Sequence, residues 1–168
     1  MIPVLVLNLK RHQERREWMA KHLGDLGIAH RFIDAIDGSQ IIDADDDINR
    51  FHRHHGRSAT LGEIGCARSH LAIARMIADG SDPFVCLIED DISLRSAVID
   101  FLDKETLHAL PPFDILRLYS LPWRQKKRAW HHSDIAGHAV VVPIKSSYGT
   151  HAQIYSRAGA AKVANLSI

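Results

Sequence analysis

Pro83-Phe84-Val85-Cys86-Leu87-Ile88-Glu89-Asp90-Asp91 decides the fold, because an apolar run passes directly into three carboxylates. A short apolar run after a turn signal is typical of a strand buried on both faces of a sheet. Acids at the end of such a strand are tolerated at the rim of the sheet, where open α/β sheets bind ligands. Clustered carboxylates also suit Mg²⁺ or Mn²⁺ held against a phosphate. The alternative is an acidic turn that caps the next element, and the three acids alone favour that interpretation slightly.

The composition is that of an ordinary soluble globular protein, with 46% hydrophobic and 24% charged residues. We expect residues 1–168 to form one domain with its own core. The net charge of +1 argues against a dedicated nucleic-acid-binding protein. No apolar run reaches the ~20 residues that span a bilayer. Cys66 and Cys86 lie in apolar segments, so we expect buried thiols without a disulfide, which fits a reducing compartment.

The first forty residues predict a strand, a helix and a second strand. Residues 2–9 are apolar but lack the basic start of a signal peptide, so we expect a first strand there. A helix follows and ends near Gly24 and Gly27, and residues 31–36 form the next strand. This order predicts a right-handed βαβ unit with parallel strands. The basic residues at 10–16 could meet a diphosphate, although such residues at a helix start are usually just solvated.

Residues 39–60 have no clear period, and we expect a mobile surface loop over the site. The acidic run at 43–47 and the histidine-rich run at 51–56 could each be a metal site by composition alone. Neither run is anchored to a predicted strand or helix end. Zinc binding is therefore kept as a minority alternative for three residues: His52, His54 and His55.

Thr60 and Glu63 have the spacing of a capping box, which predicts the start of a long helix. Apolar residues then recur at steps of three and four as far as Ala78. Small residues crowd the first two turns, which indicates that another segment packs closely there. His70 lies in the same segment. A buried, hydrogen-bonded histidine is the ordinary interpretation, and a ligand-facing histidine is the alternative.

The second half of the chain predicts shorter elements. Residues 92–110 are expected to be helical in part, and the prolines at 111–112 end that helix. A strand at 113–119 precedes the basic run at 124–128, which we interpret as an exposed loop that could face an anion. Another strand is expected at 138–142, then a turn and a strand within 147–156. Ser156 could cap a last helix at 157–166.

Several separated blocks resemble a single protein family, in the family's order and across nearly the whole chain: residues 6–11 with 14–16, 35–38, 61–71, 87–92 and 148–152. The family is glycosyltransferase family 25, the sugar transferases of lipopolysaccharide and lipooligosaccharide biosynthesis, many of them galactosyltransferases. The chain departs from the family pattern at Ala74, where tryptophan is frequent, and at Gln153, where an aromatic residue is common. It ends at Ile168, whereas family members usually continue, so we expect either a fragment or a naturally short member.

The resemblance implies a GT-A-like (Rossmann-like) α/β fold: a three-layer αβα sandwich with a mostly parallel central sheet, for which a C-terminal truncation is left open. It also implies a UDP-sugar donor, typically UDP-galactose, and a divalent cation, Mn²⁺ or Mg²⁺. By this analogy four residues lie near the nucleotide: Asn8, Leu9, Arg11 and Asp37. Ser69 and His70 line or support the cleft, and residues 89–91 form the end that holds metal and diphosphate.

We therefore predict a metal-dependent transferase that moves a sugar, expected to be galactose, to a lipopolysaccharide, lipooligosaccharide or other glycan acceptor. Glu89 and Asp91 are assigned to the metal, and Asp90 either shares that task or faces the sugar. His70 and Asp37 are candidates for the base that takes the acceptor's proton, although the base could also lie beyond this chain. One alternative is a catalytically incomplete member that binds a sugar nucleotide. Another is a metal-dependent phosphohydrolase.

We expect a cytoplasmic location, with the inner face of the inner membrane as an alternative. The expected partners are the nucleotide-sugar donor and a glycan or glycolipid acceptor. We expect no nucleic acid and at most peripheral membrane contact, and we leave a homo-oligomer open.

Overall fold

The computed structural model describes residues 1–118, 129–135, 137–143 and 149–166. The elements follow one another as β1 (Val4–Asn8), α1 (Gln13–Asp25), β2 (Arg31–Asp34), η1 (Gly38–Gln40), α2 (Asp45–His55), α3 (Leu61–Asp79), β3 (Phe84–Glu89), α4 (Val98–Phe101), α5 (Lys104–His108), β4 (Ile115–Arg117), β5 (Ala129–Ile135), β6 (His138–Pro143), β7 (Ala152–Ser156) and α6 (Arg157–Ala164). None of the helices in this described part has both the length and the apolar character needed to cross a bilayer.

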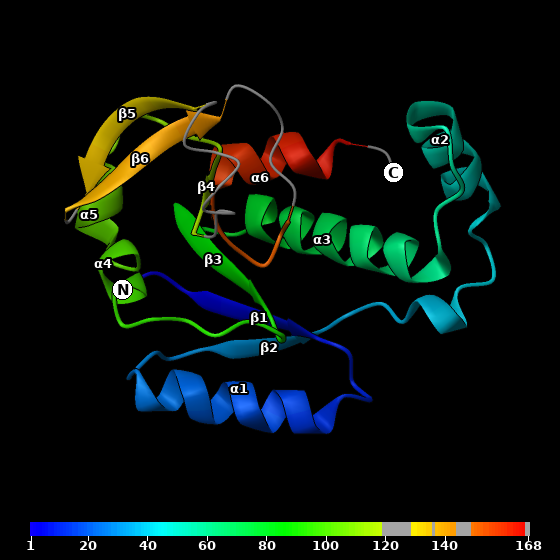
Figure 1. Ribbon diagram of the computed structural model, residues 1–168, viewed down its shortest axis with the longest axis horizontal. Helices are drawn as coiled ribbons and strands as arrows, with labels where there is room; N and C mark the ends of the chain where they lie inside the picture. The colour runs from blue at the N-terminus through cyan, green and yellow to red at the C-terminus, as the bar shows by residue number, and fades with distance from the viewer. Residues whose placement is uncertain (119–128, 136, 144–148, 167–168) are drawn as a thin grey trace.

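The central sheet has the order β2-β1-β3-β7-β4. β1 pairs in parallel with β2 and with β3, as the βαβ pattern predicted. β7 lies between β3 and β4 and is antiparallel to both. The other four strands run in one direction, so the sheet is mostly parallel. α1 covers one face, while α3 and α6 cover the other (Figure 1). The predicted α/β class and its layered, Rossmann-like arrangement are confirmed.

β3 is the centre of the core because helices cover both of its faces. Its alternate residues Cys86 and Ile88 contact the cluster that includes Met19 and Leu23 of α1. Val85 and Leu87 point the other way, into the cluster that contains residues of α3 and α6. This two-sided burial explains why the strand reads as a continuous apolar run. It also fixes where the three acids emerge, because the run ends at the rim of the sheet.

The prediction for residues 39–60 was wrong. Most of the segment is regular, with η1 and then the helix α2. Its acidic first turn and basic last turn complement the helix dipole, and Gly56 ends the helix in the left-handed conformation with φ 69°. α2 buries none of its residues. Its sequence therefore lacks the row of core-facing apolar residues by which a helix is usually recognised.

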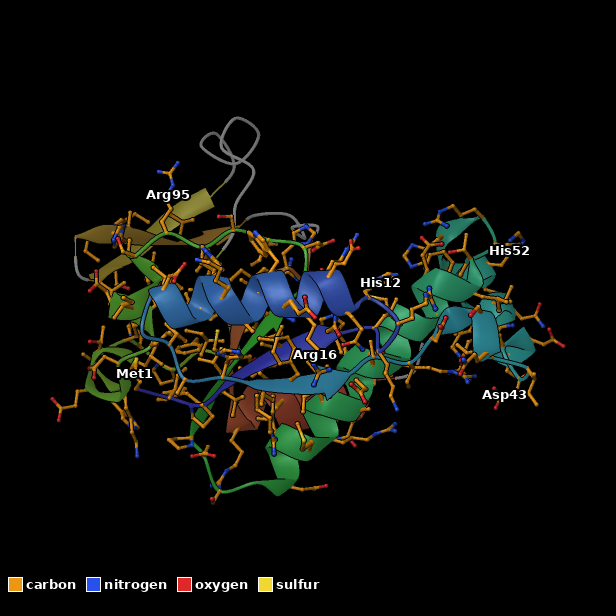
Figure 2. The ribbon with its side chains drawn as sticks, turned by 90° about the horizontal axis from the view of Figure 1, so that it is seen from below. Met1, His12, Arg16, Asp43, His52 and Arg95 are labelled. Atoms are coloured by element: carbon orange, nitrogen blue, oxygen red, sulfur yellow. The ribbon has the colours of Figure 1, made fainter. Side chains whose placement is uncertain are left out.

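α2 is held by an ion-pair cluster at one end of the molecule. Arg68 of α3 contacts Asp43 at 2.7 Å and Asp47 at 2.8 Å, so the acidic run binds a guanidinium group. Asp43 and His52 lie at the opposite end from Met1 (Figure 2). Among residues 39–60, all of which the structure describes, neither the acids nor the histidines form a group close enough to share a metal ion.

Other expectations are confirmed at element level. The Thr60–Glu63 capping box starts α3, and the Ser156 side chain accepts a hydrogen bond from the Gly159 N–H at the start of α6. Residues 92–110 contain only the short helices α4 and α5. β6 does not stand alone, because it pairs with the unpredicted β5 in a separate two-stranded sheet. The basic run at 124–128 and the expected turn at 147–148 lie outside the described residues.

Candidate functional site

The candidate site lies where the three parallel strands end. In the strand register Asn8 is opposite Asp34, and Leu7 is opposite Glu89, so the carboxyl ends of β1, β2 and β3 meet at one edge. Asp90 and Asp91 continue from Glu89 into the following turn. α1 begins just after this edge, with His12 at its first turn (Figure 2). In an open α/β sheet this edge is where ligands bind.

A cleft of about 210 Å³ opens at this edge. Its walls come from the turn after β1, the loop after β2, the first turns of α3 and the acids after β3. It is lined by most of the predicted site residues: Leu9, Arg11, Asp37, Ser69, Glu89, Asp90 and Asp91. Asn8 and His70 are both buried and stand behind this lining, where Asn8 contacts Asp90 and His70 contacts Glu89. The structure therefore brings the predicted residues of four separate segments together.

Glu89 is held by three side chains at once. Its Oε1 accepts hydrogen bonds from His70 Nε2, at 3.1 Å, and from the Thr150 hydroxyl. Its Oε2 lies 3.0 Å from His151 Nδ1. Burial alone would raise the pKa of Glu89, but hydrogen bonds from His70 and its other two partners outweigh burial and lower the pKa to about 2. Glu89 is therefore an ionised, well-oriented carboxylate at neutral pH.

His70 is the buried partner of that carboxylate. Burial alone would lower the pKa of His70, but its interactions with Cys66 and Glu89 outweigh burial and raise the pKa to about 9. His70 therefore carries a proton at neutral pH and pairs with Glu89 as a cation.

Asp90 is 8% exposed and faces the first turns of α1. Its Oδ2 accepts a hydrogen bond of 2.6 Å from the Asn8 side-chain amide, and its Oδ1 lies 3.2 Å from Arg15. The same guanidinium is 3.7 Å from Asp91, whose side chain is half exposed. Asp90 thus ties the end of β1 and the start of α1 to the turn that follows β3.

The donor atoms near Glu89 fit a divalent cation. One ligand atom each from Glu89, Asp91 and His151 lie within 4.8 Å of one another. Two carboxylates and an imidazole form a set that suits Mn²⁺, and Mg²⁺ would use mainly the carboxylates. The sequence assigned Glu89 and Asp91 to this role and did not include His151.

The opposite wall of the cleft is built by a close approach between two segments. A Cβ added to Gly65 would lie 2.7 Å from the Ile36 carbonyl oxygen, so only glycine fits there. Ser69 Oγ accepts a hydrogen bond from the Ile36 N–H and donates one to the Gly65 carbonyl. The small residues of α3 therefore hold the loop after β2 in place, as the sequence indicated. On that loop Asp37 accepts hydrogen bonds from Ser39 and pairs with Arg11.

Two further hollows adjoin the cleft. One, of about 620 Å³, is lined by Lys10 and Gln40 and shares Arg11 and Asp37 with the cleft. The other, of about 1250 Å³, begins at Asp91 and His151 and runs between α4, β4 and β6. The acids at the end of β3 therefore stand between a hollow lined by charged residues of both signs and a larger, more apolar groove.

Comparison with known proteins decides the family. The model of glycosyltransferase family 25 (LPS biosynthesis protein) matches residues 1–161. The chain belongs to glycosyltransferase family 25. The resemblance drawn from the sequence blocks is therefore confirmed.

Family 25 relatives match over most of this chain. The Xenopus laevis protein named procollagen galactosyltransferase 1-B is 28% identical over 96% of this chain and 28% of its own length. An Aedes aegypti glycosyltransferase 25 family member is 26% identical over 95% of this chain and 27% of its own length. The human inactive glycosyltransferase 25 family member 3 is 33% identical over 55% of this chain and 17% of its own length. The chain thus spans less than a third of the length of these relatives.

Sequence reasoning missed several residues of this family 25 site. Thr150 and His151 lie in a block that matched the family, yet no strand end or charge pattern near them signals contact with Glu89. Arg15 was grouped with the other basic residues of α1, and only the fold shows that it reaches Asp90. The expectation for Cys66 was wrong, because its side chain is exposed in the cleft, whereas Cys86 is buried as expected. Cys66 lies on the side of α3 that faces the cleft. The apolar character of the whole segment does not reveal which side of the helix a single residue occupies.

Proposed function

We propose that this chain is the donor-binding part of a metal-dependent glycosyltransferase that transfers galactose from UDP-galactose to a glycan acceptor. The observation that carries the proposal is the juxtaposition of Glu89, Asp91 and His151 with an arginine-lined cleft at the carboxyl edge of the sheet. Family membership supports the reaction class, and the name of the Xenopus relative supports galactose.

Glu89, Asp91 and His151 would hold the cation, which would neutralise the charge that develops on the leaving diphosphate. Arg11 and Arg15 line the same cleft and supply fixed positive charge beside it. The hollow that continues from Arg11 and Lys10 has room for the nucleotide, and we place UDP there. The acceptor would enter from the groove that begins at Asp91 and His151.

We assign positioning roles to two of the predicted catalytic residues. His70 is buried and protonated, so it orients Glu89 and does not accept the acceptor's proton. Asp90 is committed to Asn8 and Arg15 and orders the turn that presents Asp91. Asp37 lines the cleft with its carboxylate held by Arg11, which suits contact with the nucleotide.

We propose a glycan or glycolipid acceptor of the lipopolysaccharide type, because the family description names LPS biosynthesis. The name of the Xenopus relative makes a procollagen-type acceptor the alternative. We also propose a cytoplasmic location, which two free thiols support. A catalytically incomplete family member is the second candidate function, because the human relative is named inactive.

The test is a matrix of UDP-, GDP- and CMP-sugars, each with and without Mn²⁺, followed by thermal shift and by release of free nucleotide. A ligand at 100 times its Kd stabilises the folded state by about 2.7 kcal/mol, so even an inactive binder would respond. We expect a Mn²⁺-dependent response to UDP-galactose and UDP release that rises when a lipooligosaccharide acceptor is added. Binding without turnover would favour the incomplete member. Release of phosphate from simple esters without an acceptor would overturn the transferase assignment.

A further inference from the structure

Two side chains of α3 form a second cluster beside Glu89. Cys66 and His70 are one helical turn apart and therefore project from the same face of the helix. The Cys66 sulfur, one ring nitrogen of His70 and one carboxylate oxygen of Glu89 lie within 4.8 Å of one another. The thiol is exposed and lines the cleft, so an ion could reach it from solvent.

The hydrogen bonding of the His70 ring is incomplete. Nε2 contacts Glu89, but Nδ1 is buried and has no hydrogen-bond partner, although His70 is only 8% exposed. A buried polar atom without a partner costs free energy unless something binds it. A histidine that ligates a metal through one ring nitrogen generally donates its other N–H to a carboxylate, a backbone carbonyl or a water molecule. His70 and Glu89 have this arrangement, with Nδ1 left over for a ligand.

We propose that Cys66 and His70 bind a thiophilic divalent cation, with Zn²⁺ as the expected ion, at the wall of the cleft. A thiolate and an imidazole select zinc over Mn²⁺ and Mg²⁺, which prefer oxygen. When the ion binds, a Zn–S bond replaces the S–H bond of Cys66 and a Zn–N bond replaces the Nδ1–H bond of the protonated His70 ring, and both protons leave to solvent. Water fills the remaining coordination positions.

This site differs from the proposed Mn²⁺ site in its ligands and shares only Glu89 with it. Glu89 turns Oε1 toward His70 and Oε2 toward His151, so one carboxylate stands between the two sites. For the zinc site Glu89 is a positioning residue that orients the His70 ring. The inference does not depend on the proposed transferase activity, because it concerns metal binding to the chain alone.

The experiment is titration of the whole metal-free chain with Co²⁺, which reports a thiolate ligand through a charge-transfer band in the near ultraviolet. We expect the band to saturate at one Co²⁺ per chain and to disappear when Zn²⁺ is added. Cys66→Ser should abolish the band. Cys86→Ala should keep it, because Cys86 is buried in the core away from α3. Glu89→Gln should weaken Co²⁺ binding by about 10–100-fold, the usual effect of losing such a hydrogen-bond partner.

Asp91→Ala separates the two proposals, since it should remove Mn²⁺ binding and leave the Co²⁺–thiolate band unchanged. His70→Gln should eliminate tight Co²⁺ binding while circular dichroism confirms folding. If that variant does not fold, Zn²⁺ protection of Cys66 from iodoacetamide in the wild type, followed by mass spectrometry, gives the second readout. Absence of the band in the wild type, its survival in Cys66→Ser, or alkylation of Cys66 at an undiminished rate with Zn²⁺ would each overturn the inference.

Discussion

Replacing Glu89 by glutamine should change how the stability of the metal-free protein depends on pH. The pKa of Glu89 falls from 4.5 to about 2 on folding because three hydrogen bonds favour the carboxylate. A group whose pKa is lower in the folded state stabilises the fold above its unfolded pKa and loses that effect as pH falls through the folded pKa. At about 1.4 kcal/mol for each pH unit, the difference corresponds to at most about 3.5 kcal/mol of unfolding free energy.

His70 affects the same plot of stability against pH on its basic side (the basic limb), whereas Glu89 affects the acidic side (the acid limb). The pKa of His70 rises from 6.5 to about 9 on folding, so its contribution is complete below pH 6.5 and is lost as pH rises through about 9. The two limbs describe one ion pair and do not add. Glu89→Gln should remove the acid limb and weaken the basic one, because Cys66 still interacts with the His70 ring.

The assay is urea denaturation of the wild type and Glu89→Gln in the presence of a chelator, from pH 3 to about pH 10, so that it covers both folded pKa values. We expect the stability advantage of the wild type to shrink by about 2 kcal/mol between pH 7 and pH 3. Glu63→Gln is the control, since Glu63 also has a pKa lowered to about 2, by Arg57, but its ion pair is exposed and screened by water. Its effect should be clearly smaller. A difference between wild type and Glu89→Gln that stays constant with pH would refute the buried ion pair.

Two further substitutions test how the cleft is built. Gly65→Ala should destabilise the fold by about 1–3 kcal/mol, because its Cβ would overlap the Ile36 carbonyl. Gly62 has room for a Cβ, so Gly62→Ala should be neutral or slightly stabilising. Equal effects of the two substitutions in a denaturation assay would contradict this packing. Asn8→Ala should cost about 1.5–3 kcal/mol, because it removes the amide that hydrogen-bonds the buried Asp90 carboxylate, and a loss below about 0.5 kcal/mol would show that the bond contributes little.

The sheet could be predicted from sequence because its signals are local and strong. β3 is a continuous apolar run with two buried faces, and the Thr60–Glu63 capping box marks the start of α3. α2 was missed because it buries no residue and is held by Arg68, a partner from another helix. Its apolar residues Ile48 and Phe51, three positions apart, pack only partly buried against Ala44, Ala59 and Ile64, and so short a pattern was not recognised among the surrounding charged residues.

The candidate site could be predicted in part for the same reason. The three acids were placed at the sheet edge because they directly follow a buried strand. Thr150 and His151 come from the segment before β7, some sixty residues later, and join Glu89 only because β7 pairs antiparallel with β3. The pairing of two strands so far apart in the sequence cannot be predicted from the composition of either segment.

Calorimetric titration with UDP-galactose, with and without Mn²⁺, in the wild type and in Asp91→Ala tests the central claim most directly. We predict binding by the wild type that requires Mn²⁺, and no metal-dependent binding by a folded Asp91→Ala. Binding that is equally strong without the cation, or equally strong in the variant, would contradict the assignment of the acids after β3 to a metal that holds the donor.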